Sequence, residues 1–439
     1  MTYKETIDYL YNCTPQFQRI GAAAYKPGLD TVRCLSGLFG DPHRRYKVIH
    51  VAGTNGKGST SHTIAAVLQA AGYKVGLYTS PHLVDFRERM RVNGNMIPED
   101  EVVRFVERYR SLTSSGASEI EPSFFELTTV MAFDWFAREQ VDVAVIEVGL
   151  GGRLDSTNIV EASLSVITNI SFDHTAQLGN TLAEIAHEKA GIMRKGIPVV
   201  CGETTSELKK ILADEAAAHQ THICFAMDEP LCDGIDGDGS KLHLHGTRFG
   251  NLDYQLTGDC QKYNARTVLA AIERLCCDGW TIPASAVREG FSKVCSMTGL
   301  MGRWMTVSDH PFVVCDTGHN IGGWEILSRQ LAVMPRPLTV VLGFVNDKDI
   351  APILPLLPPD ADYIFTNASI PRALPAAALS AEASLRGLRG VCIPAVAEAY
   401  EAGLQRLEAG GGQGSMFVGG STFVVADLLA HLRSTKKNS

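Results

Sequence analysis

The sequence predicts an α/β fold of two domains, the first of them built on a mostly parallel sheet. Apolar runs typical of buried strands alternate with helical stretches between residues 46 and 200, as in parallel sheets that helices cover on both faces. The same alternation begins again after about residue 297. A chain of 439 residues is also too long for one ordinary core, because a domain usually spans about 100–200 residues. We therefore expect one domain over residues 1–296 and a smaller one over residues 297–439.

The first domain opens with a βαβ unit. Residues 46–52 (YKVIHVA) predict a buried strand, residues 53–59 (GTNGKGS) a glycine turn, and residues 60–71 a helix. A second strand is expected over residues 74–79. The further strands of this domain are expected at residues 141–148, 163–169 and 196–200.

The later segments also carry local signals. Thr181 and Glu184 fit a capping box that opens a helix running to Arg194. Residues 231–257 combine Gly/Asp turns with alternating polarity, which predicts an antiparallel hairpin at the edge of the first domain. The strands expected in the second domain are residues 311–315, 338–343, 361–366 and 416–418.

Composition excludes several classes of protein. A net charge of −8 and a pI near 5.9 offer no basic footprint for nucleic acid. No run of 18 apolar residues occurs, and residues 1–25 lack the apolar segment of a signal peptide, so we expect a cytoplasmic protein without a membrane span. Eleven cysteines without any C-x-x-C spacing favour reduced core thiols over a disulfide or zinc framework.

The glycine turn is the strongest chemical signal. A turn between a strand and a helix lets backbone N–H groups surround an anion at the positive end of the helix. Lys57 would meet phosphate charge, and Ser59 would offer a hydroxyl to Mg²⁺. It is a compact variant of the common phosphate loop, because two residues separate Gly53 from Gly56 and Gly58 precedes Ser59. The alternative is a glycine-rich turn without a ligand.

Polar residues follow neighbouring strands of the same domain. Ser80 follows residues 74–79, Glu147 ends the next apolar strand, and His174 follows the strand after that. The carboxyl ends of parallel strands are where ligands bind in open α/β sheets, and Mg²⁺ prefers oxygen ligands. These positions, together with Ser59, therefore favour a metal site over separate structural roles.

Lys189 lies on the helix after this region and allows two interpretations. It can form an ion pair with Glu184 or Glu188 on its own helix, or it can serve the site. The residues alone do not separate the two.

The second domain also places polar groups at strand ends. Arg303 opens the region, the sequence DTGHN (residues 316–320) ends a strand, and Lys348 and Asp349 follow another. Together they could close over an ATP site. Two other segments could suggest metal sites but are better explained without a metal. DGIDGDG (residues 233–239) lacks the ligand spacing of a calcium loop and is more typical of a hairpin turn, and His243 and His245 are expected to be surface residues.

Seven motifs occur in an order that resembles the folylpolyglutamate synthase/dihydrofolate synthase family, which is related to the Mur ligases. They are HVAGTNGKGST, TSPHLVDFRER, EVGLGGRLDSTN, TNISFDHTAQLGNTLAEIAHEKAGI, GRW, DTGHN and NDKD. The resemblance implies an N-terminal P-loop-type ATPase domain and a smaller C-terminal Rossmann-like domain, with ATP and substrates in the cleft between them. Two loops depart from the family pattern, since D-G-A-H-N becomes DTGHN and L-P-G-R becomes LMGR before Trp304.

Carried over by motif, the resemblance assigns roles to individual residues. The implied ATP-binding residues are Thr54, Asn55, Gly56, Lys57, Gly58, Ser59, Asn264, Arg303 and Asp316, among which Asn264 would contact the adenine. The implied Mg²⁺ ligands are Ser59, Ser80, Glu147, His174 and a carbamylated Lys189. The implied catalytic residues are Lys57, Lys189 and His319. The implied folate and glutamate contacts are Phe125, Glu126, Leu154, Asp155, Lys348 and Asp349.

The activity that the resemblance implies is the ATP-dependent addition of L-glutamate to a folate through an acyl phosphate, with two Mg²⁺ sites, K⁺ as a candidate further cation, and a monomeric chain. Dihydrofolate synthesis from dihydropteroate, or both reactions together, fits the same motifs. A Mur-type ligase acting on UDP-muramyl peptides would require a uridine-nucleotide domain before Gly53, where only a short segment is found. A regulator that hydrolyses ATP without ligation is the alternative from another class.

Overall fold

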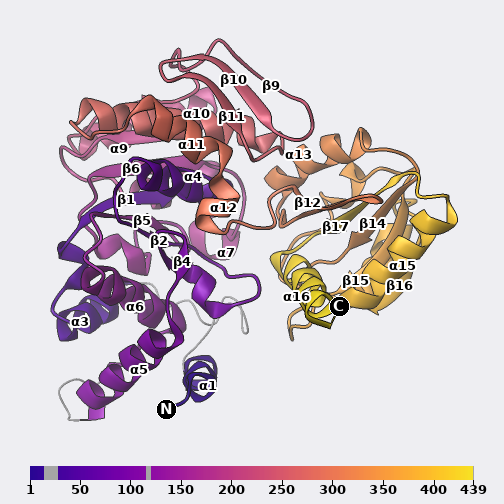
Figure 1. Cartoon of the computed structure of the whole chain (residues 1–439), viewed down its shortest axis with the longest axis horizontal. Coiled ribbons are helices and arrows are strands. Elements are labelled where there is room, and N and C mark those ends of the chain that lie inside the picture. The colour runs from indigo at the N-terminus through magenta and orange to yellow at the C-terminus, as the bar shows by residue number, and fades with distance from the viewer. Residues whose placement is uncertain (14–27, 115–119, 439) are drawn as a thin grey trace. The chain divides into compact units, whose positions relative to one another are not determined.

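The computed structural model describes residues 1–13, 28–114 and 120–438 and divides the chain into two compact units. Unit 1 comprises Met1–His82 and Phe86–Leu300, and unit 2 comprises Leu83–Asp85 and Met301–Ser439. The division falls after Leu300, whereas the sequence had led us to expect it after residue 296. Unit 2 also includes a short segment from the first half of the chain. Figure 1 shows both units as layers of helices and strands.

Unit 1 is built on an eight-stranded sheet. Its strands are β1 (Lys47–Ala52), β2 (Val75–Tyr78), β3 (Met90–Val92), β4 (Asn95–Met96), β5 (Val143–Glu147), β6 (Leu164–Asn169), β7 (Val199–Glu203) and β8 (Ile223–Phe225). Their order is β4-β3-β2-β5-β1-β6-β7-β8. The β2–β3 and β3–β4 pairs at one edge are antiparallel, and the remaining pairs are parallel. The prediction of a mostly parallel sheet is therefore confirmed.

Successive residues of a strand point to opposite faces of a sheet, and helices cover both faces of this one. Ile49 and Val51 of β1 pack in one cluster with helices α4 and α10, whereas Val48 packs in another with α3, α5 and α6. The helices of unit 1 are α1 (Tyr3–Cys13), α3 (Asp30–Leu38), α4 (Lys57–Ala70), α5 (Glu99–Ser114), α6 (Phe124–Arg138), α7 (Thr175–Leu178), α8 (Leu182–Ala190), α9 (Ser206–Ala218), α10 (Cys260–Cys277), α11 (Ala284–Ser292) and α12 (Val294–Thr298). Such strands, apolar on both faces, explain the continuous apolar runs in the sequence.

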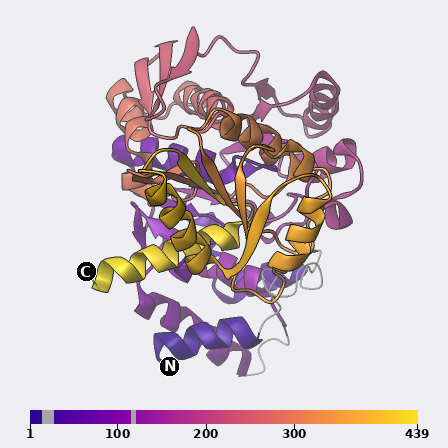
Figure 2. The same ribbon diagram turned by 90° about the vertical axis from the view of Figure 1, so that its right-hand side faces the viewer.

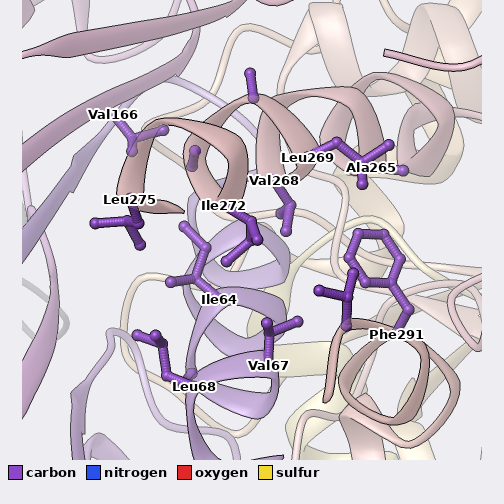
Figure 3. Packing of buried hydrophobic residues seen from close by; sticks show 14 of the residues in the cluster. Ile64, Val67, Leu68, Val166, Ala265, Val268, Leu269, Ile272, Leu275 and Phe291 are labelled. Atoms are coloured by element: carbon purple, nitrogen blue, oxygen red, sulfur yellow. The ribbon is translucent and has the colours of Figure 1, made fainter. Parts of the chain in front are cut away.

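The cluster between α4 and α10 positions the phosphate loop. Ile64, Val67 and Leu68 of α4 belong to one cluster with Val268 and Ile272 of α10, in which Ile64 lies next to Ile272, as Figure 3 shows, and all five side chains are fully buried. This packing holds α4, whose first turn follows the glycine loop directly, against α10.

A separate three-stranded antiparallel sheet belongs to unit 1. It consists of β9 (Gly234–Gly237), β10 (Leu242–Thr247) and β11 (Gly250–Tyr254), and it packs on α11. The antiparallel hairpin expected over residues 231–257 is thus present, with a third strand that was not expected. DGIDGDG is not simply a turn, because Gly234–Gly237 pair with β10, leaving the turn to the residues that follow. His243 and His245 lie on this sheet and are partly exposed, and their rings are hydrogen-bonded to Asp253 at 2.9 Å and to Asp236 at 3.0 Å.

Unit 2 has a six-stranded sheet of order β12-β13-β17-β14-β15-β16, parallel except for the β12–β13 pair. Figure 2 shows its strands in orange and yellow, flanked by helices. The strands are β12 (Met305–Asp309), β13 (Phe312–Asp316), β14 (Leu338–Leu342), β15 (Asp362–Asn367), β16 (Gly390–Ala395) and β17 (Ser415–Gly419). The helices are α13 (Ile321–Ala332), α14 (Ala376–Ser384), α15 (Val396–Ala409) and α16 (Thr422–Asn438). β12 and β16 were not expected from the sequence.

Two expectations about side chains and membranes can be compared with the structure. The ten cysteines whose side chains are described are all free thiols, but Cys34, Cys277 and Cys392 are exposed, so the expectation of core thiols is wrong for these three. None of the described helices has the length and apolar character needed to cross a membrane.

Candidate nucleotide and metal site

The glycine loop between β1 and α4 folds into a tight, internally bonded turn. Lys57 reaches back over it and donates to the carbonyl oxygens of Gly53 and Thr54, at 3.0 Å each. Gly56, the residue that precedes α4, has a φ of 81°, which glycine adopts without strain. The helix begins at Lys57, three residues before the expected start, so the N–H groups of its first turn belong to the loop.

The residues after β6 support this loop from behind. The backbone N–H of Asn55 donates to the side chain of Asn169 at 2.8 Å, and the Thr54 hydroxyl donates to the carbonyl oxygen of Ser171 at 3.0 Å. Thr168 donates to the carbonyl oxygen of Asn55. These hydrogen bonds hold the shape of the loop, and a loop that is already ordered loses less conformational entropy when it binds an anion.

The first turns of α4 hold hydroxyl groups that are buried. Ser59 is 1% exposed, and its Oγ accepts a hydrogen bond from Gln261 of α10 at 3.2 Å. The Oγ1 of Thr60 is also buried but has no hydrogen-bond partner among the described residues. Because a buried polar atom without a partner is costly, Thr60 fits a loop whose hydrogen bonds are completed by a ligand.

Asn264, the predicted adenine contact, lies against the same loop. A Cβ on Gly56 would come within 2.3 Å of the Asn264 Oδ1. The Asn264 side chain also donates to Gln261 Oε1 at 2.8 Å. α10 therefore reaches the loop through a short chain of hydrogen bonds that ends at Ser59.

The predicted metal ligands lie at one edge of the sheet of unit 1. Ser80 follows β2, Glu147 ends β5, the loop with Ser59 follows β1, and His174 follows β6; these four strands are direct neighbours. The N–H of Ser80 donates to the Glu147 carboxylate at 3.2 Å, and this carboxylate is 4% exposed. His174 is the residue directly before the short helix α7, and it has the left-handed conformation, with a φ of 50°. The oxygen atoms of Ser59, Ser80 and Glu147 fit the preference of Mg²⁺.

Lys189 on α8 is buried, at 3% exposure, and has no ion pair among the described residues. The two carboxylates that could have paired with it on its own helix are used elsewhere: Glu184 completes the capping box with Thr181, as predicted, and Glu188 pairs with Arg153 at 2.7 Å. Burial, together with the positive charge of Lys57, lowers the pKa of Lys189 to about 7. A large fraction of this amine is therefore neutral near pH 7 and able to react as a nucleophile.

The predicted wall of the folate site consists of Phe125 and Glu126 on α6 and of Leu154 and Asp155 in the loop after β5. The ring of Phe125 packs so closely on Gly149 that a Cβ there would approach it to 2.4 Å. Glu126 is buried and accepts hydrogen bonds from Ser123 within a capping box. Asp155 is buried too, accepts from the N–H groups of Leu150 and Thr157 at 2.8 and 2.9 Å, and has a pKa raised by burial. Leu154, beside it, is partly exposed.

Unit 2 brings Arg303, Asp316 and the following loop together. The Asp316 carboxylate accepts from the N–H groups of Trp304 and Gly318, at 2.6 and 2.7 Å, and burial raises its pKa while Arg303 opposes the shift. Arg303 donates to the hydroxyl of Thr317. His319 Nδ1 donates to the Thr317 carbonyl oxygen at 3.0 Å, which fixes the tautomer and orientation of the ring.

Lys348 and Asp349 occupy the turn after β14. The N–H of Lys348 donates to Val345 at 3.3 Å, and Asp349 accepts from the N–H of Ala351 at 3.1 Å. Asp349 is exposed, whereas Lys348 is partly buried. β14, which they follow, is separated by β17 alone from β13, the strand that ends at Asp316.

No group of three or more His, Cys, Asp and Glu side chains with metal-binding geometry occurs in the part of the chain that the structure describes. This finding does not address the predicted ligands, because two of them are serine hydroxyls and one is a lysine that becomes a ligand only when carbamylated. The structure joins Ser80 to Glu147 through the Ser80 backbone N–H, and the side-chain oxygens of both residues are of the kind that Mg²⁺ prefers.

Two residues of the site were not identified from the sequence. Gln261 bonds to both Ser59 and Asn264, and its only signal was its place one helical turn before Asn264. Thr317 bonds to Arg303 and to the Gly302 carbonyl oxygen, and its signal was the departure of DTGHN from the family pattern. The same departure puts Gly318 where a Cβ would come within 2.4 Å of Leu327, so the pair Thr317-Gly318 fits this loop.

Comparison with known proteins accounts for both units. The Mur ligase middle domain matches residues 51–272, and the Mur ligase glutamate ligase domain matches residues 302–419. The chain is 38% identical over 327 residues to the dihydrofolate synthase/folylpolyglutamate synthase of Escherichia coli (strain K12), covering 74% of this chain and 73% of that one. It is 33% identical over 400 residues to the folylpolyglutamate synthase of Lacticaseibacillus casei, covering 87% and 89%.

Solved structures agree. E. coli FolC in complex with DHPP and ADP superposes with a TM-score of 0.83 at 30% identity, covering 99% of each chain. The bifunctional folylpolyglutamate synthase/dihydrofolate synthase of Yersinia pestis c092, complexed with AMPPNP and Mn ion, superposes with a TM-score of 0.81 at 29% identity, covering 99% of this chain and 98% of that one. The fold and the site thus define an ATP-dependent ligase of the Mur type. Within that class, the chain belongs to the dihydrofolate synthase/folylpolyglutamate synthase family.

Proposed function

We propose that this chain joins L-glutamate to a reduced folate, with cleavage of ATP to ADP and phosphate. The observation that carries the proposal is that β2, β5, β1 and β6 are neighbours in one sheet and that their carboxyl ends lead to Ser80, Glu147, the phosphate loop and His174, respectively. A phosphate loop beside an oxygen-rich metal site is what phosphoryl transfer to a carboxylate requires.

The reaction divides into two steps. A substrate carboxylate attacks the γ-phosphorus of ATP, giving an acyl phosphate and ADP, and the amine of glutamate then attacks the acyl carbon and displaces phosphate. The N–H groups of residues 56–59 hold the phosphates, and Lys57, now folded over the loop, moves its ammonium group onto the transferring phosphoryl. Mg²⁺ bound by Ser59, Ser80, Glu147 and His174 would supply neutralisation of the charge that spreads over the phosphate oxygens.

Lys189 is proposed to be carbamylated. Its burial, the absence of an ion pair among the described residues and its lowered pKa favour attack of the neutral amine on CO₂. The resulting carbamate gives this position a carboxylate, which would hold a second Mg²⁺, and it removes the cost of a buried ammonium.

The residues around the acceptor and the nucleotide complete the proposal. Phe125 and Leu154 offer apolar surface to the pterin ring, and the buried Glu126 and Asp155 shape this wall through their backbone hydrogen bonds. In unit 2, Arg303, Asp316 and His319 are proposed to act on the nucleotide, while Lys348 and Asp349 serve nucleotide and glutamate. We further propose that the chain works as a monomer in the cytoplasm, which light scattering and localisation of a tagged chain would test.

Dihydrofolate synthesis is a second candidate, because the E. coli relative carries both names and the FolC structure contains DHPP. In that reaction the acceptor is dihydropteroate and the first glutamate is added. The two reactions use the same phosphate loop and the same metal ligands, so they differ only in the acceptor.

The deciding experiment measures ADP release with Mg-ATP and L-glutamate, using tetrahydrofolate in one reaction and dihydropteroate in another. We expect glutamate-dependent release with tetrahydrofolate. Release with dihydropteroate as well means that the chain carries out both reactions, and release with dihydropteroate alone replaces the proposal with dihydrofolate synthesis. ADP release that does not depend on glutamate would contradict ligation and favour an ATP-hydrolysing regulator.

A further inference from the structure

Gln261 on α10 links the predicted adenine contact to the predicted metal ligand. Its side chain is 1% exposed, and Asn264, one helical turn later, is 7% exposed. Asn264 donates to Gln261 Oε1 at 2.8 Å, and Gln261 donates through Nε2 to Ser59 Oγ at 3.2 Å. All three residues belong to unit 1, and the contact between α4 and α10 that carries them is part of its core.

The direction of these hydrogen bonds matters. The Asn264 Oδ1 faces Gly56, so its Nδ2 points to Gln261. Gln261 must therefore present its oxygen to Asn264 and its amide N–H to Ser59. As a result, the Ser59 hydroxyl accepts from Gln261 with one lone pair and keeps the other lone pair and its proton for ligands.

Without the Gln261 donor, the Ser59 hydroxyl could form a different hydrogen bond. Serine and threonine hydroxyls in helices often donate to the carbonyl oxygen four residues earlier. Thr63 in the same helix does this, donating to the carbonyl oxygen of Ser59 at 2.7 Å. A Ser59 hydroxyl turned the same way would point back along α4 and would no longer offer its oxygen to a metal ion.

We propose that Gln261 is a positioning residue, which holds the Ser59 hydroxyl in the orientation that a divalent cation requires, and that Asn264 in turn holds Gln261. The inference rests on the proposed function only for the identity of the cation as the one bound with ATP. Residues that orient a metal ligand through a hydrogen bond typically change metal affinity by about 10–100-fold when they are removed.

The test uses Gln261→Met in the full chain, since methionine has a similar length and shape but no hydrogen-bonding amide. Mn²⁺ binding is followed by electron paramagnetic resonance in the presence of ADP, which needs no turnover. We expect the dissociation constant for Mn²⁺ to rise by about tenfold or more in the variant. Affinity for ADP without divalent cation should change far less, and an equal loss of ADP affinity with and without Mn²⁺ would overturn the proposal.

A matched control is Gln330→Met on α13 of unit 2, where a buried glutamine has an oxygen without a partner among the described residues. This variant should bind Mn²⁺ as the unaltered chain does. If Gln261→Met does not fold, Gln261→Asn retracts the amide by one methylene group, keeps its polarity, and should raise the same dissociation constant by a smaller factor. An unchanged constant in a folded Gln261 variant overturns the proposal.

A double-mutant comparison separates this role from a general effect on the fold. If Gln261 acts through Ser59, then Gln261→Met should add no further loss of Mn²⁺ affinity in a Ser59→Ala chain. Additive losses would overturn the proposal. Mn²⁺ binding that depends on Gln261 in a chain that fails to ligate glutamate would support this inference while contradicting the proposed function, so the two are tested separately.

Discussion

At the scale of single residues, Lys189 is a side chain whose role could not be settled from the sequence. From the sequence, we gave an ion pair with Glu184 or Glu188 of the same helix the same weight as a role in the site. The structure removes the first choice, since Glu184 caps α8 and Glu188 pairs with Arg153. Spacings of five and one residues are not those at which helix side chains meet, and the structure shows the partners that the two carboxylates take, one at the N-terminus of the helix and one in the loop after β5.

The carbamate on Lys189 can be tested directly. With ¹³C-bicarbonate we expect a carbamate resonance in the NMR spectrum of the unaltered chain that is lost in Lys189→Met. ADP release by this variant should fall by about two orders of magnitude or more, because the second metal loses its ligand. Lys195→Met, which alters an exposed lysine of the same unit, is the control and should keep both signals. A resonance that persists in Lys189→Met would place the carbamate elsewhere.

Other single residues show where prediction from the sequence ended. Ser59, Ser80 and Glu147 could be placed at one sheet edge because strand and turn signals alone locate the carboxyl ends of strands. Gln261 and Thr317 could not, because their roles depend on contacts between α10 and α4 and between Thr317 and Arg303, which no local pattern encodes.

At the scale of elements, the cores of strands and helices were predicted better than their ends. β1, β2, β5 and β6 lie within a residue or two of the expected ranges, because apolar runs mark strands that are buried on both faces. α4 begins earlier than expected because the loop residues join its first turn. α8 ends at Ala190 instead of Arg194, and the next residue, Gly191, packs on Arg153. β7 begins at Val199, three residues later than expected, after a turn at Gly196.

The junction of loop and helix yields a prediction of its own. Gly56 and Gly279 both have positive φ, 81° and 87°, but only Gly56 faces a neighbour, with Asn264 at 2.3 Å from a built Cβ; nothing lies within 4 Å at Gly279. Gly279→Ala should therefore cost only the backbone strain, about 1–2 kcal/mol in the free energy of unfolding. Gly56→Ala should cost more than this and should also abolish binding of a fluorescent ATP analogue. Equal losses of stability in chemical denaturation, with ATP binding intact in both, would mean that Asn264 does not lie against the loop.

At the scale of the whole molecule, the restart of strand and helix alternation after residue 297 predicted a second unit, and each unit has its own apolar core. Leu275 of α10 and Leu331 of α13 are both fully buried, one in each unit. Replacing either leucine with alanine removes a similar volume, so each should cost about 2–5 kcal/mol in the stability of its own unit.

Hydrogen exchange measured by mass spectrometry can locate these losses. Leu275→Ala should speed amide exchange in β1, β5 and β6, whereas Leu331→Ala should speed it in β14 and β17, because opening is local to the core that is weakened. Saturating Mg-ATP should restore protection in the Leu275→Ala chain if the phosphate loop of unit 1 binds it, since a ligand stabilises the state to which it binds. If each variant instead lost protection evenly over β1 and β14, the two cores would open as one cooperative unit, and the independence inferred from their separate packing would be wrong.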